Sequence, residues 1–228
     1  MKISVIIPTI NEEANLAELL PFLSKQAGNN IHEIIVADGG STDNSEKISE
    51  LNKIIFLKCK RKGRSVQMNE AADLATGEIL YFLHADSRPP VNFSNDIVEW
   101  VQKGYESGCF RMSFDSRHWL LRLSGWFTQF NVSWCRGGDQ SLFVTKQVFE
   151  KSGKYDEKLI IYEDNEILER IRKHSKFYVI QKRIVTSARR FNENGTIRLY
   201  LIFMWIHTRY RLGASHEQIF AYYKKHVK

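Results

Sequence analysis

The sequence predicts an α/β fold in which a mostly parallel sheet is flanked by helices. Short apolar segments typical of buried strands alternate with helically spaced apolar residues through residues 1–90. This order favours parallel pairing with right-handed crossovers. Acidic residues follow two of the strands directly, at the edge where such sheets bind ligands. With 228 residues and no repeat or linker, we expect a single domain.

The elements of the first half alternate regularly. Leu16, Leu19, Leu20 and Leu23 share one helical face and indicate the first helix, for which Asn11 is the expected cap. The other elements are strands at residues 4–7, 33–37, 54–57 and 78–83 and helices at residues 45–51 and 64–75.

The second half is less regular and mixes the two kinds of element. We expect strands at residues 108–114, 141–145, 177–180 and 184–187 and helices at residues 92–103, 119–130, 164–173, 197–212 and 216–225.

The charge and the apolar segments limit the location and the partners. The net charge of +7 favours anionic partners, which include nucleotide phosphates, an anionic membrane surface and nucleic acid. The longest uncharged apolar run, residues 199–206, is far shorter than the roughly 20 residues of a spanning helix. No signal-peptide pattern follows Met1, and the three cysteines form no CxxC pair. We therefore expect a cytoplasmic protein.

Two aspartates are candidate ligand-binding residues. Asp38 and Asp86 each leave a buried strand. The alternative for both is a turn residue that caps the next helix, which is less favoured for Asp86 because Pro89 and Pro90 follow it. A divalent cation that bridges phosphates needs few protein oxygens, so one aspartate would suffice.

Two further segments carry charge that suits a catalytic site. Residues 58–64 hold five basic residues; most fit a solvated charge run, whereas Arg64 opens a helix and suits a phosphate or a base edge. The run lacks the aromatic residues that nucleic-acid binding favours.

Acidic residues also lie at the start of a predicted helix, within residues 162–167. One of them could be a general base, or the acids could simply stabilise the first turn of the helix. The polar loop at residues 136–140 suits substrate hydroxyls. The sequence contains no GxGxxG, P-loop, GxSxG or HExxH motif.

Five segments in order resemble the family 2 glycosyltransferases, which are inverting enzymes of GT-A fold. The similarity is greatest to a short branch with FLHAD, GDQ and SARRF motifs. The matching segments are SVIIPTINEE (4–13), VADGGSTD (36–43), GRSVQMNEAADLATGEILYFLHAD (63–86), GGDQSLFV (137–144) and YEDNEILERI (162–171).

The resemblance implies a role for each matching residue. Asp164, the second acid of the ED pair, would be the catalytic base, and Glu163 would be structural. Asp86 would hold the metal as the last acid of a DxD element whose first acid is replaced by His84. The nucleotide-binding residues would be Pro8, Thr9, Glu12, Asp38, Arg64 and Ala85, and the acceptor-binding residues Gly138, Asp139 and Gln140.

The resemblance also implies the organisation and the reaction. Residues 1–90 would bind the nucleotide, 91–195 the acceptor, and 196–228 would form C-terminal helices. The reaction would be an inverting, Mn²⁺- or Mg²⁺-dependent transfer of one sugar from a nucleotide-sugar donor to an acceptor hydroxyl, because the QxxRW signature of processive synthases is absent. The alternatives are a degenerate transferase that binds a nucleotide or lipid without turnover, and a nucleotidyltransferase, although the latter favours a basic Gly-rich loop where PTINEE stands.

The expected partners follow from the same segments. We expect a nucleotide-sugar donor, an acceptor for which a lipid-linked molecule is one candidate, and no nucleic acid. The helix at residues 197–212 has Arg198, Arg209 and Arg211 beside its apolar run and Trp205 for an interface, so it is a candidate for peripheral contact with the inner face of the membrane. The alternative is a helix buried in the core or in a homodimer.

Overall fold

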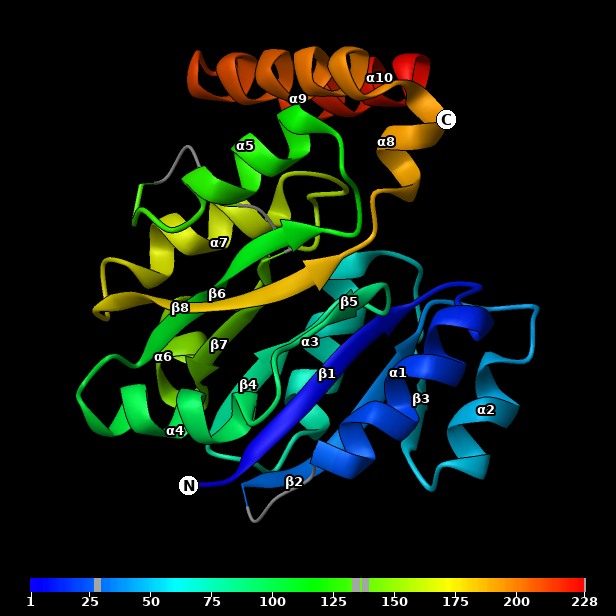
Figure 1. Ribbon diagram of the computed structural model, residues 1–228, viewed down its shortest axis with the longest axis vertical. Helices are drawn as coiled ribbons and strands as arrows, with labels where there is room; N and C mark the ends of the chain where they lie inside the picture. Colours follow the sequence, from blue (N-terminus) through cyan, green and yellow to red (C-terminus); the bar gives the residue numbers. More distant parts are fainter. Residues whose placement is uncertain (27–29, 133–135, 137–139, 228) are drawn as a thin grey trace.

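The described residues of the computed structural model, 1–26, 30–132, 136 and 140–227, form one mixed sheet flanked by helices (Figure 1). The strand order across the sheet is β3-β2-β1-β4-β7-β6-β8-β5. The strands are β1 (Ile3–Thr9), β2 (Ile31–Asp38), β3 (Ile55–Lys58), β4 (Ile79–Phe82), β5 (Ser87–Arg88), β6 (Ser107–Phe114), β7 (Leu142–Thr145) and β8 (Phe177–Thr186).

The helices cover both faces of the sheet, which confirms the predicted α/β class. α1 and α4 pack on one face, and α3, α6 and α7 pack on the other. The helices are α1 (Glu13–Gln26), α2 (Ser45–Leu51), α3 (Arg64–Leu74), α4 (Phe93–Gln102), α5 (Trp119–Phe127), α6 (Lys146–Lys151), α7 (Glu163–Ile171), α8 (Arg189–Asn194), α9 (Thr196–Arg211) and α10 (His216–His226).

The first four strands are parallel, as the sequence predicts. β1 pairs with both β2 and β4, and β2 pairs with β3. The register sets Thr9 of β1 opposite Asp38 of β2, and Ile6 opposite Phe82 of β4. The carboxyl ends of these strands therefore meet at one edge of the sheet, where the chain leaves for its loops.

The second half joins the same sheet through β7, which runs antiparallel to β4 and β6. The two strands expected at residues 177–180 and 184–187 are one strand, β8. Their apparent separation comes from a bulge, because the pairing with β6 shifts from Phe110–Ile180 to Arg111–Arg183. The polar residues in the bulge are exposed, so the apolar pattern stops there although the strand continues.

The expected cap of the first helix is wrong. α1 begins at Glu13, and Asn11 lies outside it with a left-handed φ of 53°. The Asn11 side chain instead accepts a hydrogen bond of 2.8 Å from the Thr42 amide. Asp43 takes the place of a cap, because its carboxylate accepts a 2.9 Å bond from the Glu13 amide. The cap comes from a different loop, which the local sequence does not reveal.

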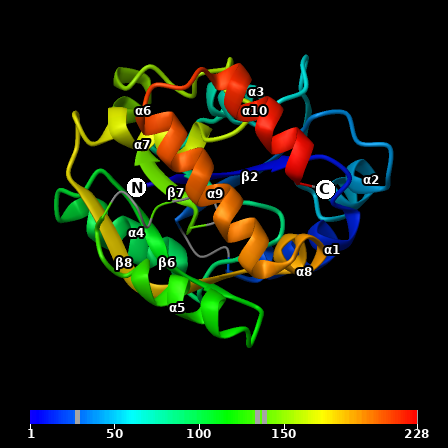
Figure 2. The ribbon, with the colours of Figure 1, turned by 90° about the horizontal axis from the view of Figure 1, so that it is seen from above.

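The C-terminal helices form a separate layer at one end of the molecule (Figures 1 and 2). α9 packs through Leu199 onto Leu121 of α5 and Phe191 of α8. Its Ile202 and Ile206 pack with Ile219 of α10. No helix within the described residues combines the length and the hydrophobicity needed to cross a membrane.

Candidate active site

The edge where β1 and β2 end is held by side chains from α3. The Gln67 amide nitrogen donates hydrogen bonds to the Thr9 carbonyl at 2.8 Å and to the Ala37 carbonyl at 2.7 Å. Thr9 and Gln67 are both buried. Because one amide satisfies both carbonyls, the ends of the two strands are fixed relative to α3. Pro8 and Thr9, both predicted nucleotide-binding residues, therefore lie on a rigid edge.

Asp38 organises the loop that follows β2. Its buried carboxylate accepts bonds from the Gly40 amide at 2.9 Å and from the Ser41 amide at 3.0 Å. These contacts show that Asp38 forms the turn, which was the alternative to its predicted role in nucleotide binding. Glu12 lies on the neighbouring loop, where it accepts a 3.4 Å hydrogen bond from Arg189.

The chain leaves β4 through His84, Ala85 and Asp86. The Ser87 amide donates a 3.1 Å bond to the His84 carbonyl, which closes a turn around Ala85. The Ser87 hydroxyl donates to Asp86 at 3.4 Å and to the Thr186 hydroxyl on β8 at 3.0 Å. Asp86 is partly exposed at this turn, on the same edge as Thr9 and Asp38.

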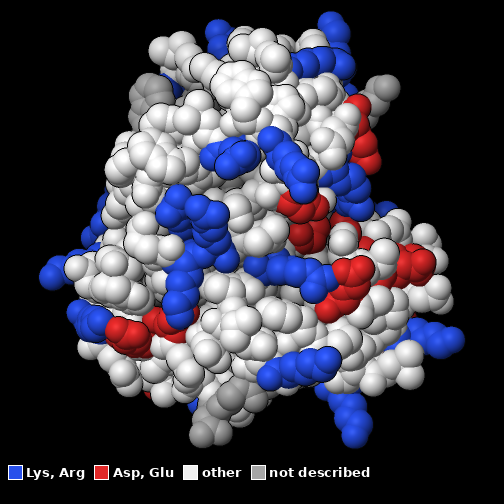
Figure 3. Space-filling view, viewed as in Figure 1, with Lys and Arg blue, Asp and Glu red and all other residues white. Residues whose placement is uncertain are grey.

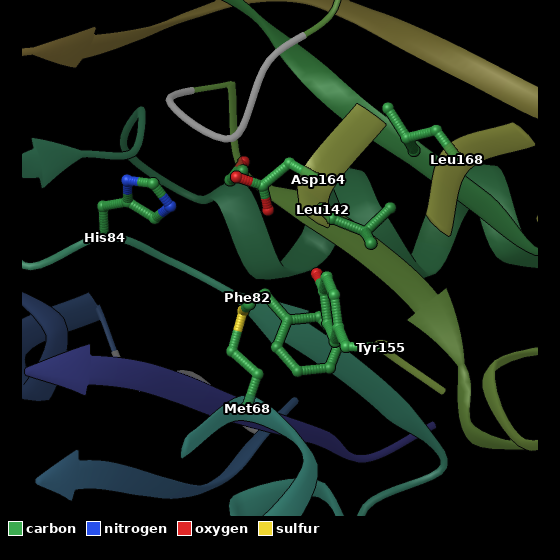
Figure 4. Close-up of a pocket in the computed structure, with 8 residues that line it drawn as sticks. Met68, Phe82, His84, Leu142, Tyr155, Asp164 and Leu168 are labelled. Atoms are coloured by element: carbon green, nitrogen blue, oxygen red, sulfur yellow. The ribbon is translucent and has the colours of Figure 1, made fainter. Parts of the chain in front are cut away.

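Asp164 reaches this exit from the other half of the chain. It lies in the first turn of α7 and lines a pocket together with His84. Figure 4 shows the two side chains directed toward the same space, above a floor of Met68, Phe82 and Tyr155. The candidate base and the first residue of the turn after β4, 80 residues apart in the sequence, therefore meet in one pocket.

Arg64 connects this pocket to α3. Its guanidinium Nη1 lies 3.2 Å from Glu163 Oε1 and 3.9 Å from Asp164 Oδ2. Glu163 is almost fully buried, whereas Asp164 retains 17% of its side-chain exposure. Burial raises the pKa of Glu163 to about 7, and the Asp164 charge adds to this, while Arg64 and His84 oppose it. Of the two acids, Asp164 is thus the one that a substrate can reach.

A Glu163→Gln variant should change how stability depends on pH. The folded-state pKa of Glu163 is raised from its ordinary value of 4.5 to about 7, so its contribution to stability is full below pH 4.5 and lost as the pH rises through 7. Glutamine removes this loss. Between pH 4.5 and pH 8 we expect the free energy of unfolding of the variant to increase by about 3 kcal/mol relative to that of wild type.

Urea unfolding at pH 4.5, 6 and 8 measures this difference. Glu169→Gln is the matched control, because Glu169 is an exposed acid of the same helix. A difference between Glu163→Gln and wild type that stays constant over this pH range would contradict the buried, protonated carboxyl.

The predicted acceptor loop is described only in part. Gly138 and Asp139 lie outside the described residues. Gln140 is buried, and its side-chain oxygen accepts hydrogen bonds from Arg136 and from the Cys109 thiol. These bonds hold the residue against β6, so Gln140 has a positioning role in addition to its predicted acceptor contact.

A divalent cation fits this edge only together with a substrate. Among the described residues, no three His, Cys, Asp or Glu side chains are arranged to hold a metal ion. Asp86 supplies one hard oxygen ligand, and His84 two residues earlier supplies nitrogen rather than a second oxygen. A magnesium-type ion typically takes one or two carboxylates, substrate phosphates and water, so Asp86 meets the protein's share of that set.

Sequence reasoning missed several residues that shape the site. Gln67 and Tyr155 have no motif signal, because each acts through contacts formed only in the folded chain. Tyr155 is buried in the pocket floor, and its backbone is paired with Asn69 of α3 by bonds of 2.9 and 3.0 Å. Burial, followed by the charges of Asp164 and Glu163, raises the pKa of Tyr155 well above its ordinary value.

The comparison with solved structures supports the architecture. A crystal structure of residues 1–349 of S. aureus TarS matches with a TM-score of 0.69, covering 87% of this chain and 64% of that one. The sequence identity is 19%, so this likeness shows the fold alone. It agrees with the GT-A architecture that the resemblance implied.

Curated relatives are similar to this chain over only part of their length. The dolichol-phosphate mannosyltransferase of Pyrococcus furiosus is 32% identical over 109 residues, which make up 46% of this chain and 31% of that protein. The undecaprenyl-phosphate 4-deoxy-4-formamido-L-arabinose transferase of Proteus mirabilis is 31% identical over 114 residues, 46% of this chain and 35% of that protein. The chain thus spans about a third of the length of these relatives.

The family model settles the classification. The model described as glycosyl transferase family 2 matches residues 4–155, which is most of the chain. The match includes the strand ends that carry Thr9, Asp38 and Asp86. Together with the GT-A architecture, this match shows that the chain belongs to glycosyl transferase family 2.

Proposed function

We propose that the chain transfers one sugar from a nucleotide-sugar donor to an acceptor hydroxyl, with inversion and with the help of Mn²⁺ or Mg²⁺. The observation that carries the proposal is the shared pocket of Asp164 and His84, which sets a reachable carboxylate beside the β4 exit. Residues 1–90 then hold the donor, and residues 91–195 supply the base and the acceptor side. The TarS structures solved with UDP and with UDP-GlcNAc support a nucleotide-sugar donor.

The residues divide the reaction between them. The acceptor oxygen attacks the anomeric carbon, the bond from that carbon to the diphosphate oxygen breaks, and the nucleoside diphosphate leaves. Asp164 takes the acceptor proton on the face opposite the leaving group. Arg64 lies 3.9 Å from Asp164 and is a cation for the departing diphosphate. A cation held by Asp86 would neutralise the same phosphates.

A screen of sugar nucleotides by thermal shift, with and without Mn²⁺, tests the donor class. A ligand that binds only the folded state raises the melting temperature by mass action. We expect one nucleotide series to raise it more with Mn²⁺ than without. Transfer to water or to a simple alcohol by the best donor then separates turnover from binding alone. Nucleotide binding without any turnover over a panel of acceptors would favour the degenerate, binding-only alternative.

We also propose that the layer formed by α5 and α9 rests on an anionic membrane surface. Exposed apolar side chains recur along α9 at Ile197, Leu201 and Met204 and along α5 at Trp119 and Trp126. Neither helix contains an acidic residue, and α9 carries three arginines. Figure 3 shows uncharged side chains in the middle of this upper part with basic ones around them, whereas basic and acidic side chains lie side by side further down. Apolar area with flanking cations is the combination that binds membrane interfaces.

Leu201→Glu should weaken binding to anionic vesicles in a flotation assay at low salt. The substitution puts a charge into the exposed apolar stripe without disturbing the buried face of α9, so the fold should persist. Leu51→Glu is the matched control, because Leu51 is exposed on α2, outside this layer. Equal flotation of both variants and wild type, or no flotation of wild type, would exclude this surface as the contact.

A further inference from the structure

A second recess lies between α7 and α9, beside the pocket of Asp164. The side chains of Asn165, Leu168, Glu169 and Arg172 line it from one face of α7, with the spacing i, i+3, i+4 and i+7. Its cavity volume is only about 20 Å³, so a ligand larger than a water molecule would sit at its open mouth. Leu168 lines both recesses. The two recesses therefore lie on adjacent faces of one helix.

Two arginines of this recess, Arg136 and Arg172, contact neutral groups, and Arg136 is also buried. Arg136 is only 7% exposed, and its guanidinium donates to the Thr128 carbonyl at 2.8 Å, to the Cys109 thiol at 3.2 Å, and also to Phe130 and Gln140. None of these acceptors carries a negative charge. Within the described chain Arg136 forms no ion pair, and its Nε has no hydrogen-bond partner. Burying a cation without a counter-charge is costly, so the charge of Arg136 would favour an anion held in the recess by the more exposed arginine Arg172.

Arg172 is partly buried and likewise contacts neutral groups. It donates to the Asn131 side-chain oxygen at 2.5 Å, and its guanidinium carbon lies 4.8 Å from the Phe177 ring centroid. Its Nε also has no partner among the described residues, and no described carboxylate pairs with it. Burial and, after it, the charge of Arg136 lower the pKa of Arg172, and both arginines line the same recess.

α9 contributes a third cation from the opposite side. Arg211 and His207 both line the recess. Burial and then the charge of Arg211 lower the pKa of His207, so this imidazole is neutral at pH 7. Glu169 is the one acid among the lining residues. Three arginines and one glutamate therefore line the recess, and this excess of basic over acidic side chains favours an anion such as phosphate.

We propose that this recess, lined by Arg136, Arg172 and Arg211, binds a phosphate group carried by the acceptor. The proposal rests on the proposed transferase function, because it places the acceptor on the α7 side of Asp164. Asn165 of the recess directly follows Asp164, and Leu168 separates the two recesses. A phosphate held by guanidinium groups on one face of α7 would fix the acceptor while its nucleophilic oxygen lies at the adjacent face.

The test is a calorimetric titration with methyl phosphate at constant ionic strength, with UDP and Mn²⁺ present to fill the donor site. We expect Arg172→Gln and Arg211→Gln each to weaken methyl phosphate binding about tenfold or more, since each removes charge-assisted hydrogen bonds. Lys173→Gln and Arg209→Gln are the matched controls: each removes one positive charge next to a tested residue but does not line the recess. The controls should bind as wild type does.

Two further arms make the outcome decisive. Glu169→Gln should strengthen methyl phosphate binding, because it removes the one negative charge of the recess, whereas mere structural damage would weaken it. Acetate should bind more weakly than methyl phosphate. Equal losses in tested and control variants, no effect of Glu169→Gln, or equal binding of acetate would each overturn the proposal. A separate UDP titration reports on the donor site, so failure of the transferase function shows there and not in the methyl phosphate arm.

Discussion

Replacing Asp164 by asparagine is expected to lower transfer turnover by roughly 10²–10⁴-fold, the usual cost of losing a general base. The amide keeps the size of the carboxylate and can still accept a hydrogen bond, but it cannot take the acceptor proton. Asp164 is the reachable member of the acid pair, with 17% exposure against 3% for Glu163. Nucleotide affinity should change little, because the donor loops lie on β1, β2 and β4.

The measurement is steady-state transfer by Asp164→Asn, with Glu163→Gln as the comparison and nucleotide binding measured in parallel. Glu163→Gln should retain more activity, since its carboxyl is buried and holds its proton up to about neutral pH. The opposite order, with Asp164→Asn largely active and Glu163→Gln inactive, would assign the base to Glu163.

Replacing Asp86 by alanine is expected to remove the metal-dependent part of nucleotide binding and to lower turnover by about 100-fold or more. The loss of a cation that neutralises the diphosphate costs several kcal/mol of charge stabilisation. The fold should survive, because the Asp86 side chain is partly exposed and its hydrogen bond from the Ser87 hydroxyl is long, at 3.4 Å.

Isothermal titration of UDP and GDP, each with and without Mn²⁺, measures the effect. Asp73→Ala is the matched control, because Asp73 is an exposed aspartate of α3 that pairs with Lys154 on the surface. We expect wild type and Asp73→Ala to bind more tightly with Mn²⁺, and Asp86→Ala to bind equally with and without it. An Asp86→Ala protein that keeps the full Mn²⁺ enhancement would place the metal elsewhere.

The sequence predicts the first half of the fold well because its central strands are buried on both faces. β1 and β4 are continuous apolar runs, and such runs are distinct from the helical patterns between them. The acids at the strand ends follow from the same order, since parallel strands end at one edge. The cap of α1 was missed because it comes from Asp43, which is remote from the helix in the sequence.

The second half was less predictable because its key contacts connect distant residues. The burial of Glu163 depends on α3, and its partner Arg64 lies 99 residues away. The bulge in β8 hides one strand behind a polar gap. Arg136 reads as part of a flexible polar loop, although the structure buries its guanidinium. The local sequence pattern around one residue carries no information about such long-range contacts. The environment of the candidate residues in the second half therefore has to be derived from the folded chain.

The anchors around α7 determine where chimeric enzymes from this family can be joined. Tyr162 precedes the helix with a left-handed φ of 71°, and its hydroxyl lies 2.7 Å from His207 Nδ1. Ile161 and Tyr162 pack with the α9–α10 cluster, whereas the Leu159 carbonyl is bonded to Ser65 of α3 at 3.0 Å. The chain therefore passes from contacts with α3 to contacts with α9 and α10 within two residues. A recombination joint at Ile160 would keep both sets intact, whereas a swap of α9 and α10 alone would separate Tyr162 from the histidine that holds it.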